Sequence, residues 1–169
     1  MPASGRSSIE LSIDQKSIQV VTKALRAEAD GKALRKELVA DLRTAIAPGI
    51  SEVQAKLRAI PHESGTRSSP PLGSYLASKV KPQVRMSGRA TGVAVRIART
   101  PQLRGFTFAA KRFNRDGWRH KVFGREVWVE QTSPIRGYFD QTLGNGKAKY
   151  RAAVIQALEA MARRIAERR

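Results

Sequence analysis

Few residues of this 169-residue chain are suited to acid–base or metal chemistry. His62 and His120 are the only histidines and there is no cysteine, which excludes a zinc–thiolate site and a thiolate nucleophile. His120 also lies between two cations, Arg119 and Lys121, which repel a metal ion. Gly146-Lys147 does not complete a phosphate-binding loop, because that pattern also needs a glycine at position 141 and Ser or Thr at position 148. We therefore expect no catalytic residue, no metal and no cofactor, and a protein that is not an enzyme.

Residues 104–128 have the most distinctive chemistry. Six of the ten aromatic residues lie there, interleaved with seven basic residues. This mixture is typical of surfaces that stack the bases and neutralise the phosphates of single-stranded nucleic acid. The alternative is that the aromatic side chains form a core while the cations face water. The cations expected to contact DNA or an acidic partner, some just upstream of the segment, are Arg96, Arg99, Lys111, Arg112, Arg115, Arg119, Lys121 and Arg125.

The charge balance supports an anionic partner. The chain has 32 Lys and Arg against 14 Asp and Glu, a net charge of +18, and residues 61–125 hold 14 of the basic but only 2 of the acidic residues. Such a surface attracts nucleic acid, an anionic membrane or an acidic protein. No apolar run approaches the roughly 20 residues of a membrane helix, and residues 1–14 do not resemble a signal peptide. We expect synthesis in a cytoplasm and no membrane partner.

The helices that would support this segment are predicted at both ends of the chain. Apolar residues at helical spacing predict a long amphipathic helix over 15–60, or two or three in series, weakened at Gly31 and kinked or restarted at Pro48. A second clear helix is predicted over 147–167, where Val154, Leu158, Met161 and Ile165 form an apolar stripe. Its terminal arginines suit the negative end of a helix dipole.

The middle of the chain is predicted to be mainly extended. We expect strands over 83–87 and 92–100, joined by a turn at 88–92, with Val93, Val95 and Ile97 on one face and Arg96 and Arg99 on the other. The remaining predictions are a strand over 9–13, a flexible Pro/Gly/Ser-rich loop over 61–74, short helices over 72–80 (ended by Pro82) and 106–115, an extended segment over 121–131, and a turn at 133–137. This order predicts one α+β domain, residues 1–169, with a long kinked N-terminal helix and a C-terminal helix packed on a small antiparallel sheet.

The run Trp118-Arg119-His120-Lys121-Val122-Phe123-Gly124-Arg125-Glu126-Val127-Trp128-Val129-Glu130-Gln131 resembles a stretch of the tail-component proteins of long-tailed bacteriophages, also called tail-completion, neck or head–tail joining proteins. Members of that family often have Pro where this chain has Lys121, and a longer turn after Gly124. The wider layout is similar too, including the aromatic turn Gly137-Tyr138-Phe139 before the last helix.

The resemblance implies a structural protein of the virion neck. It would form a ring, of about six copies by tail symmetry, that completes the top of the tail and joins it to the head connector around the DNA channel. Its partners would be itself, the connector, the tail-tube or tail-terminator protein, and DNA. The residues expected at subunit contacts are Arg67, Pro70, Pro71, Trp118, Trp128, Tyr138 and Phe139. The alternative is an independent, sequence-independent nucleic-acid-binding protein of nucleoid type.

Overall fold

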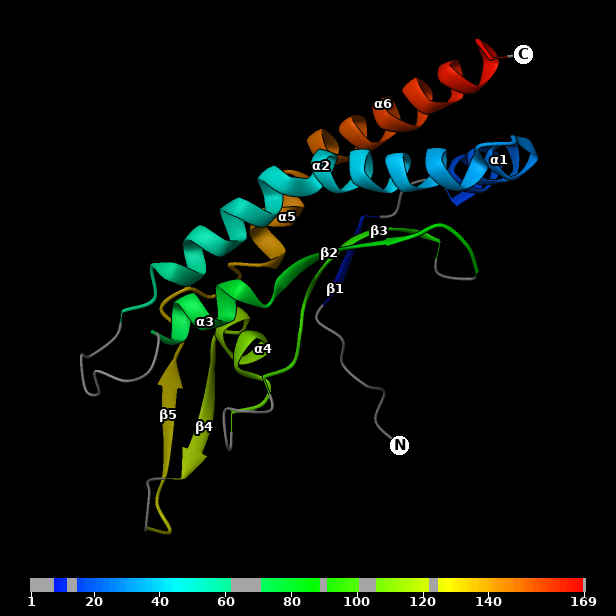
Figure 1. The fold of residues 1–169 in the computed structure, drawn as a ribbon. Helices are drawn as coiled ribbons and strands as arrows, with labels where there is room; N and C mark the ends of the chain where they lie inside the picture. Colours follow the sequence, from blue (N-terminus) through cyan, green and yellow to red (C-terminus); the bar gives the residue numbers. More distant parts are fainter. Residues whose placement is uncertain are drawn as a thin grey trace.

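The fold is α+β, as the sequence predicts, with one strand before the first long helices and the other strands between them and the C-terminal helix (Figure 1). The computed structural model describes residues 8–11, 15–61, 71–88, 91–100, 106–121 and 125–168. The predicted loop over 61–74 lies mostly outside these ranges, apart from residue 61 and residues 71–74.

The predicted N-terminal helical stretch consists of two helices, α1 (Gln15–Ala27) and α2 (Gly31–Arg58). The break falls at Gly31, where an added Cβ would collide with the carbonyl oxygen of Leu25, so only glycine permits this close turn. α2 continues through Pro48 and bends in its second half (Figure 1), consistent with the backbone hydrogen bond that proline cannot donate.

The C-terminal helix α6 (Lys147–Ala166) runs alongside α2, and α1 packs against both. Its predicted apolar stripe is buried in the core, so the spacing identified the correct face. One of its terminal arginines, Arg164, contacts Glu37 at 2.7 Å and Asp41 at 3.0 Å on α2. This arginine therefore links two helices in addition to any effect on the helix dipole.

A three-stranded antiparallel sheet lies against this helical layer (Figure 1). Its order is β1 (Ser8–Leu11), β3 (Gly92–Ile97), β2 (Val80–Arg85), with β3 in the centre. β2 begins three residues earlier than predicted and includes Pro82 opposite Val95. Proline is tolerated there because β2 is an edge strand, where an N–H group is not required on the outer side.

The remaining elements include three short helices. α3 (Leu72–Ser78) lies between α2 and β2, whereas α4 (Ala109–Asn114) and α5 (Asp140–Asn145) lie between β3 and α6. α5 was not predicted from the sequence. Instead of one extended segment over 121–131, the chain forms a hairpin of β4 (Gly117–Lys121) and β5 (Trp128–Thr132), so only Lys121 of β4 and most of β5 lie in the predicted segment. Buried residues of the helices and of the three-stranded sheet form one hydrophobic cluster.

Candidate functional site

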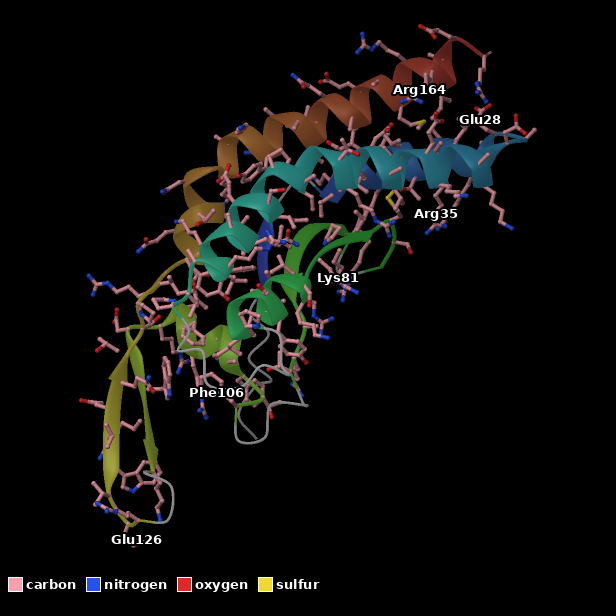
Figure 2. The ribbon with its side chains drawn as sticks, turned by 60° about the vertical axis from the view of Figure 1, so that its left-hand side comes forward. Glu28, Arg35, Lys81, Phe106, Glu126 and Arg164 are labelled. Atoms are coloured by element: carbon pink, nitrogen blue, oxygen red, sulfur yellow. The ribbon has the colours of Figure 1, made fainter. Side chains whose placement is uncertain are left out.

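The β4–β5 hairpin projects from the body of the molecule (Figure 1). In Figure 2, Phe106 lies near its base and Glu126 at its far end. All five residues of β5 are exposed to solvent, although the strand pairs with β4 along its whole length. We call residues 125–129 the hairpin tip. Val127, Trp128 and Val129 are 56%, 53% and 41% exposed there, so an apolar group lies on the surface.

The base of the hairpin is fixed to the body. The hydroxyl of Ser133, just after β5, donates a hydrogen bond to the carbonyl of Phe113 in α4. Asn114 at the end of α4 accepts a hydrogen bond from the Phe139 amide at 2.9 Å, and its carbonyl accepts one from the Gly137 amide at 2.8 Å. These bonds hold the β4–β5 hairpin, which we call the arm, at a defined position, while its far end extends away from the body (Figure 1).

The aromatic residues of the 104–128 segment divide into two groups. Phe106, Phe113 and Trp118 pack against one another with ring centroids 5.1–5.9 Å apart. Trp118 is only partly buried there, but its ring is engaged with its own chain. Phe108 and Trp128 are exposed. The first group forms a small core, as the second interpretation predicts, whereas the exposed group leaves contact with nucleic acid as a prediction.

Charged side chains surround Trp128 on one face of the hairpin. The register places Lys121 opposite Trp128 and Arg119 opposite Glu130. The Arg119 guanidinium lies 5.9 Å and the Lys121 ammonium 5.8 Å from the centre of the Trp128 ring. Lys121 also pairs with Glu126 at 3.0 Å. The indole is thus a solvent-facing apolar group with cations and carboxylates at its edge, which is the usual anatomy of an interface hot spot.

Of the other predicted cations, Arg125 lies at the hairpin tip and the rest lie outside the hairpin. Arg96 is exposed on the sheet, and Arg99 lies beyond the end of β3 rather than on its outer face, with its guanidinium 5.3 Å from the Phe108 ring. Arg112 in α4 lies over Phe106 at 5.0 Å, so part of its role is packing. Lys111 is half-buried in α4, whereas Arg115 and Arg125 are exposed.

A basic face of the three-stranded sheet was not identified as a unit from the sequence. The register puts Lys81 of β2 directly opposite Arg96 of β3. Arg85 of β2, opposite Gly92, lies four residues further along the strand and therefore on the same face. We call these three residues the basic sheet face; Lys81 is labelled in Figure 2. Opposed like charges destabilise a strand pair unless an anion lies between them. Glu10 of β1 shares this face by register, and none of the three cations forms an ion pair with the side chains that the structure describes.

Two predicted subunit contacts are core residues. Tyr138 and Phe139 are 2% and 1% exposed, and the Tyr138 hydroxyl donates a hydrogen bond to the Ala110 carbonyl at 3.2 Å. Burial, with a smaller effect of the nearby Asp140 carboxylate, raises the pKa of Tyr138 above its ordinary value. These side chains have almost no surface to offer a partner, which corrects their assignment as contacts.

The loop contacts are only partly placed. Pro71 is exposed immediately before α3, while Arg67 and Pro70 lie outside the described residues. The described ranges contain no cluster of three or more His, Asp or Glu side chains suited to a metal ion. No helix in those ranges has the length and apolar character needed to cross a bilayer.

No protein-family model, no curated protein and no solved structure matches the chain.

Proposed function

We propose that this chain is a structural virion protein of the phage neck. It forms a ring of about six copies that completes the tail top and joins it to the head connector around the DNA channel. The hairpin arm supports this proposal twice. It contains the run over residues 118–131 that resembles the tail-component proteins, and it is also the element that leaves the body with apolar side chains exposed.

The observation that carries the proposal is the exposure of Val127, Trp128 and Val129 at the end of the arm. Contiguous apolar groups on a soluble surface usually mark a protein–protein interface, particularly when polar residues surround them. A two-stranded hairpin has little stability of its own, so an arm of this kind gains most from packing against a partner. An assembly subunit that reaches its neighbour through this arm accounts for both features.

The positive charge is consistent with a position around DNA. The basic sheet face offers three cations without ion-pair partners in the described part of the chain, and the chain as a whole carries +18. Phosphates in a channel would relieve the repulsion between Lys81 and Arg96.

Depletion of the protein during phage production tests this function. We expect DNA-filled heads and free tails to accumulate separately in electron micrographs, and a supplied wild-type copy to restore joined particles. A Trp128→Ser copy should restore far fewer, while Phe108→Ser, which alters an exposed aromatic residue outside the arm, is the matched control. Normal numbers of joined, infectious particles after depletion would contradict the proposal.

The basic sheet face also favours a second candidate, a nucleoid-type protein that binds nucleic acid without sequence preference. The logarithm of its binding constant would fall with the logarithm of salt concentration at a slope of about −0.9 per phosphate contacted. Lys81→Ala and Arg96→Ala should each reduce that slope by about one contact. Arg43→Ala, an exposed cation on α2, is the control and should leave it nearly unchanged. An abundant protein on host DNA that is missing from particles would favour this candidate.

A further inference from the structure

A groove between α1 and α6 is the second exposed apolar surface of the molecule. Its volume is about 490 Å³. The floor includes buried Val21 and Leu158, and the walls carry Val20, which is 68% exposed, and Ile155, which is 37% exposed. The lining residues are Lys16, Ser17, Val20, Val21, Arg151, Ile155, Leu158, Glu159 and Ala162. The groove is therefore apolar at its centre and charged at its rim.

The hairpin tip has matching chemistry. Trp128 is exposed on one face of the hairpin, and its neighbour Val129 is exposed on the opposite face. The groove volume of about 490 Å³ lies within the roughly 300–1,000 Å³ of sites that accept drug-sized ligands, so it has room for one indole. Glu126 and Glu130 flank Trp128 along the chain, and the groove rim carries Arg151. Arg125 at the tip corresponds to Glu159 at the rim in the same way. Because Glu126 is already paired with Lys121, the opposite-charge pairs available to the contact are Glu130 with Arg151 and Arg125 with Glu159, around an apolar centre.

The tip and the groove lie at opposite ends of the molecule. In Figure 1 the β4–β5 hairpin extends to the lower left, whereas α1 and the C-terminal half of α6 lie at the upper right. One chain cannot bring its own tip into its own groove while the base of the hairpin stays bonded to α4. A contact between these two different surfaces joins two copies, either reciprocally in a two-fold dimer or head to tail, and repeated head-to-tail contacts give a closed ring or an open filament.

We propose that the hairpin tip of one copy binds in the α1–α6 groove of the next copy, with Trp128 against Val20 and Ile155. This inference rests on the proposed function in one respect, the assumption that the protein assembles with itself. It names the two surfaces that form the subunit contact, and it gives the contact a direction around the ring.

Complementation between two interface variants tests the contact with purified protein. Trp128→Ser removes the tip but leaves the groove, and Ile155→Asp spoils the groove but leaves the tip. In sedimentation velocity we expect wild type to form oligomers, each variant to be monomeric, and an equimolar mixture of the two to form a 1:1 dimer that grows no further. Phe108→Ser is the matched control, because it removes an exposed aromatic side chain that belongs to neither the tip nor the groove. This variant should assemble like wild type.

Cysteine cross-linking tests the pairing directly, since the natural chain contains no cysteine. We expect Val127→Cys and Ile155→Cys proteins to form a disulfide-linked heterodimer when mixed and oxidised, with little linkage in either protein alone. Wild type that stays monomeric up to millimolar concentration would overturn the inference, and so would mixed variants that remain monomeric or linkage mainly between like cysteines. A cross-link without the protein in phage particles would instead refute the neck function and keep the contact, so the two failures are distinguishable.

Discussion

The closest approach between the two longest helices depends on a glycine. Gly49 of α2 lies against the ring of Tyr150 in α6, and a Cβ at position 49 would be 2.8 Å from Cζ and 2.9 Å from Cε2 of that ring. Real Cβ atoms essentially never make contacts this short. The ring is 2% exposed and also packs on Gly146, so it has no free space into which to move. We expect Gly49→Ala to force a shift between α2 and α6.

Two effects of opposite sign set the size of the change. Alanine in place of a helical glycine stabilises by up to about 1 kcal/mol, because the unfolded chain loses conformational freedom. Overpacking a filled core costs about 1–3 kcal/mol. The net expectation for Gly49→Ala is a free energy of unfolding lowered by about 0–2 kcal/mol.

Gly144→Ala in α5 separates the two effects. No heavy atom lies within 4 Å of a Cβ placed there, so this variant should be neutral or stabilised by up to about 1 kcal/mol. The difference between the two variants then isolates the steric cost, about 1–3 kcal/mol, which urea unfolding monitored by circular dichroism can measure. Equal stabilities for Gly49→Ala and Gly144→Ala would refute the packing argument.

Three further predictions concern single side chains. Burial raises the pKa of Tyr138 above 10.0, so the hydroxyl loses its proton at lower pH in the unfolded chain than in the folded one. The stability that this group contributes is therefore complete below pH 10 and falls above it. Tyr138→Phe should flatten the decline of the urea midpoint above pH 10. Arg164 contacts Glu37 and Asp41, and all three side chains are partly exposed. Arg164→Met should therefore lower the free energy of unfolding by no more than about 1 kcal/mol. In thermal unfolding, 1 M NaCl should reduce the difference in Tm between this variant and wild type. Arg115 is exposed, whereas Arg112 lies over the Phe106 ring. If Arg115 contacts DNA or a partner, Arg115→Glu should keep the wild-type Tm and yield unjoined heads and tails. Arg112→Glu should also destabilise the fold, by about 0.5–1 kcal/mol.

Helical periodicity identified most of the core correctly. The stripe from Val154 to Ile165 is buried, and so are Leu34, Leu38 and Leu42 in α2. Periodicity works here because each of these helices buries one face over several turns. The period of two that is typical of strands likewise placed Val93, Val95 and Ile97 on the inner face of β3.

Local signals were less informative where tertiary contacts decide the structure. Pro82 reads as the end of a helix, but it lies inside an edge strand, and this displaced the start of β2 and concealed the pairing of Lys81 with Arg96. α5 has only six residues, too few to show helical periodicity, although it packs in the core through Leu143. Register and packing partners are long-range properties, so neighbouring residues do not specify them.

The candidate site was predictable in part for the same reason. The sequence identified Trp128 and the surrounding cations, but it assigned Tyr138 and Phe139 to the surface because adjacent aromatics in a turn carry no signal of which side is covered. The groove residues Val20 and Ile155 belong to two helices far apart in the chain. Only the packing of α1 against α6 brings them together.

The central claim is that this chain is a component of the virion neck, and its copy number in particles tests that claim most directly. Quantitative mass spectrometry of density-purified phage particles should find about six copies for each particle, far fewer than the major capsid protein. Absence from purified particles, with the protein abundant in the lysate or on host DNA, would contradict the account and favour a nucleic-acid-binding role.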